Sequence, residues 1–249
     1  MQRYFVNQLA SDNCFTISED DYHHIVRVMR MQIGDQIICV DSQNKSSICI
    51  LVEITEFLVT AKIVKWIEAT SELPINVTIV SGLPKGDKLE WIIQKGTELG
   101  AYQFIPFISG RSVVKWDEKK GVKKVERWQK IAKEAAEQSH RTVLPLVMNP
   151  INLKSLLKMS EKFDYKVIAF EEEAKLGEAR LFSKTLCEIK TGQSLLFVFG
   201  PEGGLTEHEV STLTENGFRT CGLGPRILRT ETAPLYALSA VSYHFELME

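Results

Sequence analysis

Two glycine-rich segments near the carboxyl end of the chain hold the residues best suited to chemistry. The first reads Gly-Pro-Glu-Gly-Gly-Leu-Thr over residues 200–206 and follows an apolar run over residues 194–199 that predicts a buried strand. Glycines lack a β-carbon, so a ligand or another stretch of backbone can come close and meet free amide groups. A tight turn needs no carboxylate between its glycines, so Glu202 favours a ligand site over a plain turn.

The residues after the first segment predict a helix that starts beside it. Thr206 and Glu209 have the spacing of a capping box, so the helix should begin at Thr206 and end near Gly217. A strand, a glycine turn and a helix in this order are typical of a ligand-binding site. The glycine pattern is not the G-x-G-x-x-G of dinucleotide folds and lacks the lysine and hydroxyl ending of a P-loop, which disfavours a nicotinamide or nucleoside-triphosphate enzyme.

The second segment, residues 223–235, follows a strand-like piece over residues 218–222 and precedes an apolar helix. Thr230 or Thr232 can cap that helix, and Pro234 suits its first turn. The two threonines and the proline therefore have a structural explanation.

Two arginines of the second segment have no such explanation. Arg229 lies near the proposed helix start, where an unpaired cation opposes the positive end of the helix dipole, so we expect an anionic partner such as a phosphate or a carboxylate. Arg226 suits a ligand contact or a solvated surface, and both interpretations stay open.

A third polar cluster, residues 137–141, ends a basic helix. His140 is a possible general base, but a histidine at a helix carboxyl end also suits the helix dipole, and no serine or cysteine nucleophile pattern lies nearby. We favour the structural interpretation. The lysine-rich run over residues 115–133 is either a solvated helix face or, with Arg111 and Trp116, a track for a phosphate backbone.

Composition limits the class of protein. A chain of 249 residues with 44% hydrophobic residues can build a full-sized core. No apolar run reaches the roughly 20 residues of a membrane span, and no signal-peptide segment opens the chain, so we expect a cytoplasmic protein with no membrane partner. Five cysteines without a C-x-x-C pair argue against a disulfide framework and a zinc site, His23 and His24 lack further ligand spacing, and we expect no metal. The net charge of −2 gives no overall indication of nucleic acid.

The first part of the chain predicts a small β-barrel or curled sheet. One short amphipathic helix is expected over residues 20–30. A polar stretch over residues 68–74 is the best boundary, which gives domains of residues 1–72 and 73–249. Strands are expected at residues 35–40, 47–52 and 58–64.

The second part alternates strands with longer helices, which predicts a mostly parallel sheet covered on both faces. Asp87 can cap a helix that stops at Gly100. Further helices are expected at residues 122–139, 152–159 and 177–189, and strands at residues 77–80, 104–108 and 165–170.

Taken together, these segments resemble the RsmE family of small-subunit ribosomal RNA (uracil-N3) methyltransferases, in the SPOUT superfamily. The resemblance implies an α/β fold: a small N-terminal PUA-like β-barrel that docks RNA, and a C-terminal SPOUT methyltransferase domain whose chain end forms a deep trefoil knot. One departure is His140, where many members of the family have glycine. The segments that carry the resemblance are residues 200–206, residues 223–233, residues 134–139 with Arg141, residues 85–90 with residues 95–100, and His24 with Arg30.

The resemblance implies that S-adenosylmethionine binds among three loops, with adenine in an apolar slot formed by Leu223, Ile227 and Leu228. The cofactor-binding residues it implies are Phe170, Glu171, Phe199, Gly200, Pro201, Gly203, Gly204, Leu223, Gly224, Ile227, Leu228, Thr230 and Ala233.

Methyl transfer to uracil N3 requires that its proton be removed and that N3 lie in line with the methyl group. As a hypothesis, Arg141 and Arg229 orient the nucleotide and stabilise negative charge on the base. Glu202 or Glu231 accepts the proton, and the sequence does not choose between them.

The expected partner is 16S ribosomal RNA in the assembled 30S subunit. The expected RNA contacts are Arg3, Tyr4, His24, Arg27, Arg30, Lys85, Lys88 and Arg111. The family also implies a homodimer, to which the apolar last helix can contribute, although the same residues suit ordinary core packing. The helix residues in question are Leu235, Leu238, Val241, Tyr243 and Phe245.

Two other functions stay open at this stage. One is a non-catalytic RNA-binding factor for ribosome assembly that keeps the fold. The other is a SPOUT methyltransferase that modifies another position in ribosomal or transfer RNA.

Overall fold

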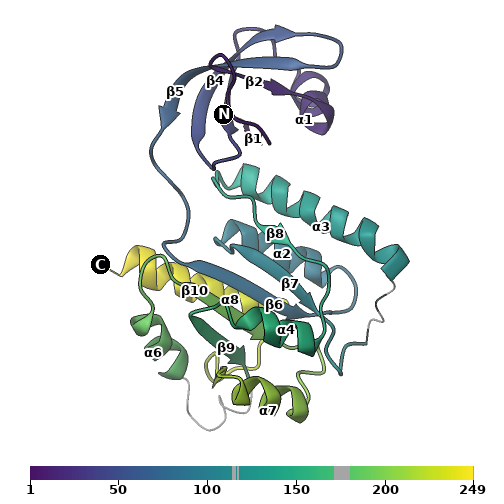
Figure 1. Cartoon of the computed structure of the whole chain (residues 1–249), viewed down its shortest axis with the longest axis vertical. Helices are drawn as coiled ribbons and strands as arrows, with labels where there is room; N and C mark the ends of the chain where they lie inside the picture. The colour runs from purple at the N-terminus through teal and green to yellow at the C-terminus, as the bar shows by residue number, and fades with distance from the viewer. Residues whose placement is uncertain (114–115, 117, 171–179, 249) are drawn as a thin grey trace. The chain divides into compact units, whose positions relative to one another are not determined.

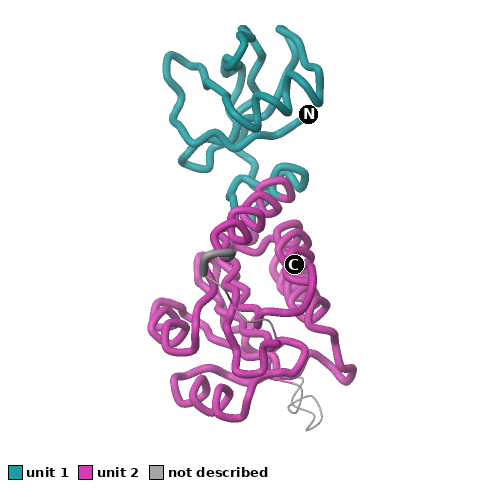
Figure 2. Tube along the Cα trace, turned by 90° about the vertical axis from the view of Figure 1, so that its right-hand side faces the viewer, with its two compact units in different colours: residues 1–72, 136–144 teal, residues 73–135, 145–249 magenta. Residues whose placement is uncertain are grey.

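The computed structural model describes residues 1–113, 116, 118–170 and 180–248. The chain forms two compact units, one of Met1–Glu72 with Ala136–Leu144 and one of Leu73–Ala135 with Pro145–Glu249 (Figure 2). The chain therefore crosses between the units three times. The boundary predicted after residue 72 placed residues 136–144 in the second domain, whereas they belong to the first unit.

The first unit is built on one five-stranded sheet in the order β1-β3-β4-β5-β2. Its three long strands, β3 (Gln36–Val40), β4 (Ser46–Ile54) and β5 (Val59–Ile67), pair antiparallel and confirm the three strands predicted here. The short strands β1 (Arg3–Phe5) and β2 (Cys14–Ile17) were not predicted; β1 pairs parallel to β3, and β2 pairs antiparallel to β5. The unit closes over inward side chains that alternate along the strands, such as Ile37, Cys39, Cys49, Leu51, Val59 and Ala61.

The single helix predicted over residues 20–30 is wrong in its second half. An α-helix, α1 (Glu19–His23), gives way to one turn of π-helix, η1 (His24–Val28). Ile25 in this turn is completely buried in the core of the first unit, whereas Met29, directly after the turn, lies at the surface.

The second unit is built on a six-stranded sheet in the order β11-β9-β10-β6-β7-β8, and every pairing in it is parallel. This confirms the mostly parallel sheet. The strands are β6 (Asn76–Gly82), β7 (Gln103–Phe107), β8 (Leu146–Val147), β9 (Tyr165–Ala169), β10 (Ser194–Phe199) and β11 (Arg219–Cys221).

Helices cover both faces of this sheet, as predicted (Figure 1). Successive side chains of a strand point to opposite faces, so Leu195, Phe197 and Phe199 of β10 enter one core, and Leu196 and Val198 enter the other. The first core is completed by α2 (Lys88–Glu98), α3 (Glu118–Gln138), α6 (Arg180–Glu188) and α8 (Thr232–Ser242), and the second by α4 (Leu153–Ser160) and α7 (Glu207–Glu215). The last helix continues into a π-helical turn, η2 (Tyr243–Leu247). Across the described ranges, no helix combines the length and the apolar content needed to cross a bilayer. The trefoil knot stays a prediction.

The start of α7 confirms the predicted capping box. The Thr206 hydroxyl accepts the Glu209 amide at 3.1 Å, and the Glu209 carboxylate accepts the Thr206 amide at 2.8 Å. The same buried carboxylate accepts the amide of Gly110 at 2.8 Å and the hydroxyl of Ser109 at 3.1 Å. This cap therefore joins the start of α7 to the loop that follows β7.

Replacing the capping hydroxyl tests how much this junction stabilises the fold. Thr206→Ala is expected to lower the free energy of unfolding by about 1 kcal/mol, because one amide at the helix start loses its acceptor. Thr214→Ala is the matched control, since Thr214 is exposed on the same helix and its hydroxyl only donates back to the Val210 carbonyl. Urea titrations measure both variants, and equal losses would contradict a capping role.

Candidate functional site

A cavity of about 530 Å³ lies where β9, β10 and β11 end. The carboxyl ends of parallel strands meet at one edge of a sheet, and open α/β sheets bind their ligands there. Of the thirteen residues expected to bind a cofactor, Glu171 lies outside the described residues and the other twelve line this cavity. Those twelve are Phe170, Phe199, Gly200, Pro201, Gly203, Gly204, Leu223, Gly224, Ile227, Leu228, Thr230 and Ala233.

The first glycine segment closes tightly on itself. A β-carbon at Gly200 would lie 2.8 Å from the Gly204 carbonyl carbon and 2.9 Å from the Leu205 amide nitrogen, so only glycine fits. Gly204 has open space around it but a φ of +70°, which again favours glycine. The glycines were predicted to allow the close approach of a ligand or of another stretch of backbone, and at Gly200 it is the backbone of the loop itself that comes close.

The loop also rests on the neighbouring strand β6. A β-carbon at Gly82, the last residue of β6, would lie 2.4 Å from the nitrogen and Cδ of Pro201. Gly82 was not predicted as a site residue, although a glycine at the end of a strand signals a close backbone approach. Arg111 was predicted as an RNA contact and not as a cavity residue, but it lines the cavity and its guanidinium donates to the Gly203 carbonyl at 3.1 Å.

The second segment supplies an apolar wall. Ile227 is 74% exposed, although large aliphatic side chains are usually covered, and Leu223 and Leu228 are partly buried beside the same cavity. Gly224 turns the chain with a φ of +93°. The wall can receive a flat apolar group such as a nucleobase.

A charged cluster of Lys88, Glu202 and Glu231 joins both segments to α2. The Lys88 ammonium lies 2.8 Å from Glu202 Oε1 and 3.7 Å from Glu231 Oε2. Burial acts to raise the pKa of Glu202, but the hydrogen bond from Lys88 and the amide of Lys85, at 3.1 Å, hold it below its ordinary value. The hydrogen bond to Glu202 raises the pKa of Lys88. A carboxylate with a lowered pKa is a weak proton acceptor, which argues against Glu202 as a general base.

Glu231 occupies the capping position of α8, so the cap predicted at Thr230 or Thr232 is wrong. The Glu231 side chain makes no capping hydrogen bond with the described residues; instead the Arg229 carbonyl accepts the amides of Thr232 at 2.9 Å and Ala233 at 3.0 Å, because the backbone already turns tightly there. Glu231 Oε2 is buried and has no hydrogen-bond partner among the described residues.

The Arg229 guanidinium is exposed, and it makes no hydrogen bond or ion pair with the part of the chain that the structure describes. Its positive charge acts to lower the pKa of Lys88, so the two cations are neighbours. An unpaired guanidinium beside this cluster is available to an anionic or carbonyl group of a ligand.

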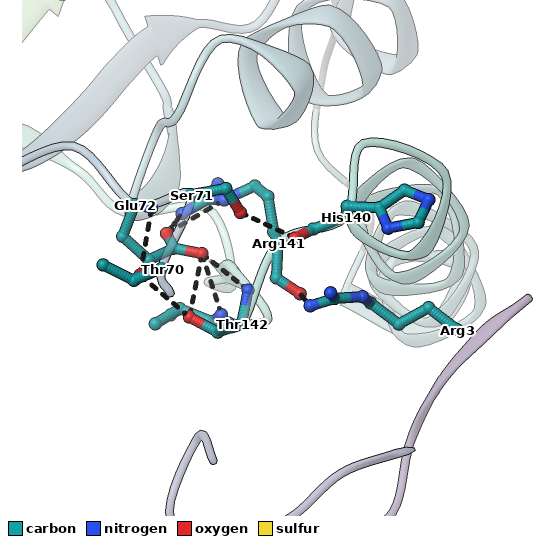
Figure 3. Close-up of polar contacts among 8 residues, drawn as sticks. Arg3, Thr70, Ser71, Glu72, His140, Arg141 and Thr142 are labelled. Atoms are coloured by element: carbon teal, nitrogen blue, oxygen red, sulfur yellow. Dashed lines mark hydrogen bonds and ion pairs between the residues drawn. The ribbon is translucent and has the colours of Figure 1, made fainter. Parts of the chain in front are cut away.

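Arg141, expected to be catalytic, is buried in the first unit, and Figure 3 shows its polar contacts. Its Nε donates to Glu72 at 3.0 Å, its Nη2 donates to the same carboxylate, and its carbonyl accepts Arg3 Nη1 at 2.7 Å. Glu72 also accepts the amides of Thr142 at 2.7 Å and Val143 at 3.0 Å. These bonds give Arg141 a structural role, and its catalytic role stays a prediction.

His140 follows the end of α3 with a φ of +60°, the conformation that favours glycine. Its amide bonds the Glu137 carbonyl at 3.3 Å, and the Arg141 amide bonds the Ala136 carbonyl at 2.9 Å, which together close the helix in a Schellman motif. This conformation explains why a glycine suits the position. Burial first, then the charges of Arg3 and the amino terminus, lower the pKa of His140, which does not fit the helix-dipole stabilisation expected for it.

The residues expected to contact RNA divide by exposure. Arg3 and Tyr4 are buried, which argues against direct contacts of these two residues with RNA. The Tyr4 hydroxyl lies 2.9 Å from His24 Nδ1. Arg27 and Arg30 are exposed on the first unit. In the second unit, Lys85 is exposed, Lys88 is paired as described and Arg111 lines the cavity; Lys115 of the basic run lies outside the described residues.

The chain is similar in sequence to known RNA methyltransferases. Residues 71–242 match the family described as RNA methyltransferase domain, and residues 17–64 match the RNA methyltransferase PUA domain. The chain is 56% identical over 252 residues to the ribosomal RNA small subunit methyltransferase E of Bacillus subtilis, covering 100% of this chain and 98% of that protein.

Two similar solved structures contain a cofactor. A ribosomal RNA small subunit methyltransferase E from Neisseria gonorrhoeae, bound to S-adenosyl methionine, is 30% identical with a TM-score of 0.83 over 97% of both chains. A putative methyltransferase from Legionella pneumophila, in complex with the bound cofactor SAM, is 27% identical with a TM-score of 0.81 over 96% of both chains.

The Glu72–Arg141 pair predicts a pH-dependent stability of the first unit. Burial acts to raise the pKa of Glu72, but Arg141 and the amides of Thr142 and Val143 lower it overall. A carboxylate with a lowered folded pKa stabilises the fold above its unfolded pKa of about 4.3, and this contribution is lost as the pH falls through the folded value.

Glu72→Gln is therefore expected to cost about 3 kcal/mol of unfolding free energy at pH 7, because Arg141 keeps its charge without a charged partner. The difference from the unsubstituted protein should shrink at pH 4 and below. Urea titrations across this range measure it, with the exposed Glu68→Gln as control. A difference that does not change with pH would contradict the ion pair.

Proposed function

Because the chain belongs to the RsmE family of ribosomal RNA small subunit methyltransferases, we propose that it methylates N3 of a uridine in 16S ribosomal RNA, with S-adenosylmethionine as the methyl donor. The observation that carries this proposal is the cavity at the strand ends, which both glycine-rich segments line. Membership of the family supports RNA methylation. Carboxylates beside the cavity support a target nitrogen that must first lose a proton, as uracil N3 does.

The cavity suits this cofactor in size and in chemistry. Its volume of about 530 Å³ lies within the range of small-molecule sites, roughly 300–1,000 Å³. The apolar wall of Leu223, Ile227 and Leu228 would hold the adenine, and the tight glycine loop would hold the rest of the molecule near backbone amides. When bound, the cofactor supplies the methyl group and leaves as its thioether.

Glu231 is the better candidate for the proton acceptor. Its Oε2 accepts no hydrogen bond within the described ranges, whereas Glu202 Oε1 already accepts hydrogen bonds from the Lys85 amide and the Lys88 ammonium. The N3 proton would pass to Glu231, the electron pair left on N3 would form the bond to the methyl carbon, and the electrons of the carbon–sulfur bond would stay on sulfur. The exposed Arg229 would stabilise the negative charge that develops on the uracil oxygens.

The RNA would dock through exposed cations on the first unit, among them Arg27 and Arg30. The target base must leave its stack to reach the cavity, or be displayed by an assembled particle, which supports the 30S subunit as substrate. The cytoplasm is the compartment we expect, because that substrate is found there.

Single-turnover methylation tests this proposal and its rivals. Glu231→Gln should slow methylation about 100-fold or more, because an amide cannot accept the proton, while the calorimetric Kd for S-adenosylmethionine changes little. Glu202→Gln should have a smaller effect on the rate. The substrate is 30S subunits from a strain that lacks the enzyme, and mass spectrometry maps the modified nucleotide.

Each rival function has its own outcome in this experiment. Absence of cofactor binding would favour a non-catalytic assembly factor. Modification of another nucleotide, or of a ribose hydroxyl, would favour a different specificity. Unchanged rates in both variants would eliminate a carboxylate base.

We also propose a homodimer that uses the exposed side of the last helix. Leu238 and Val241 are fully buried in the core of their own unit, so the packing interpretation holds for these two. Tyr243 is 57% exposed and Leu247 is 71% exposed, which leaves an apolar surface for a second copy.

Sedimentation equilibrium tests this dimer. Tyr243→Ser should weaken self-association about 10-fold or more, because a large aromatic group is lost from the contact. Tyr102→Ser is the control, since Tyr102 is an exposed tyrosine that precedes β7. A monomeric parent protein, or equal weakening by both changes, would contradict the proposed surface.

A further inference from the structure

Lys88 is the one described residue that forms ion pairs with carboxylates from both glycine-rich segments. It is the first residue of α2, Glu202 lies in the loop after β10, and Glu231 lies at the start of α8. The three side chains are far apart in the sequence, and their meeting point lies beside the cavity that Glu202 lines. Any movement of either segment changes a charged contact of this one ammonium group.

The two contacts of Lys88 differ in kind. At 2.8 Å from Glu202 it makes a charge-assisted hydrogen bond, and the Lys85 amide fixes the same oxygen at 3.1 Å. At 3.7 Å from Glu231 it acts only through its charge, and that oxygen is buried and accepts no hydrogen bond from the described residues. Lys88 thus holds one carboxylate by a hydrogen bond and attracts the other by charge alone.

We propose that Lys88 is a positioning residue for methyl transfer, which clamps the first glycine segment through Glu202 and aims Glu231 at the substrate proton. This inference rests on the proposed function. It replaces the RNA contact that the sequence suggested for Lys88, since the ammonium is already paired within the protein. It also predicts that the charge and the reach of the side chain both matter.

Three roles for Lys88 predict different kinetics. Loss of a phosphate contact raises the KM for RNA and flattens the dependence of binding on salt. Loss of a purely structural contact lowers the Tm and weakens cofactor binding without a specific effect on the chemical step. Loss of a positioning contact lowers kcat with little change in KM, because the reacting groups are misaligned.

The test compares Lys88→Met, Lys88→Arg and Lys95→Met. Lys95 is a matched control, because it lies on the same helix, pairs with Glu98 at the same 2.8 Å, and is 37% exposed against 36% for Lys88. Lys88→Met should lower kcat about 10- to 100-fold with the KM for 30S subunits within about twofold, Lys88→Arg should recover most of the rate, and Lys95→Met should behave as the parent.

A second readout needs no turnover. Carbon-13 NMR of labelled glutamate carboxylates, assigned with Glu202→Gln, should show the pKa of Glu202 rising in Lys88→Met and staying low in Lys95→Met. An unchanged titration, an unchanged kcat, or a raised KM with a flatter salt dependence would each overturn the inference while the proposed function stands. A parent protein that binds the cofactor but methylates no RNA would overturn both.

Discussion

The position of the cavity depends on a close backbone contact between the ends of two neighbouring parallel strands, β6 and β10. Strands β6 and β10 pair in register up to Ser81 and Phe199, so the next residues, Gly82 at the end of β6 and Gly200 after β10, lie at the same edge of the sheet. Pro201 then lies so close to Gly82 that a β-carbon there would collide with its backbone nitrogen. Because backbone cannot give way as a flexible side chain can, this contact fixes where the first glycine segment starts, and the cavity and the charged cluster follow from that position.

Local patterns predicted the parts of the fold that short stretches of sequence determine. The capping box at Thr206 and Glu209 formed as expected, because both partners lie within one helical turn. Continuous apolar runs correctly predicted the central strands, because a strand that is buried on both faces consists almost entirely of hydrophobic residues. Ten of the twelve predicted cavity residues lie in the two glycine-rich segments, and Phe170 and Phe199 lie at the ends of strands, so correct strand ends and the family resemblance were enough to predict them.

The unpredicted features depend on partners far apart in the chain. Glu72 and Arg141 are 69 positions apart, and Lys88 and Glu202 are 114 positions apart, so no periodicity relates them. Sequence reasoning therefore treated Arg141 as a catalytic group and Lys88 as an RNA contact, whereas each has an internal carboxylate as its partner. The π-helical turn after His23 was not predicted for another reason. The spacing of apolar residues over so short a segment does not distinguish an α-helical turn from the wider turn of a π-helix.

The return of residues 136–144 to the first unit determines how that unit can be isolated. Ala136 and Leu144 pack against Phe5 and Val40, and the same segment supplies the polar partners of Glu72. A fragment cut after residue 72 would leave this apolar patch bare and a carboxylate without its cation. An autonomous first unit thus requires the nine-residue piece to be grafted back through a linker, because the unit is continuous in space but discontinuous in the gene.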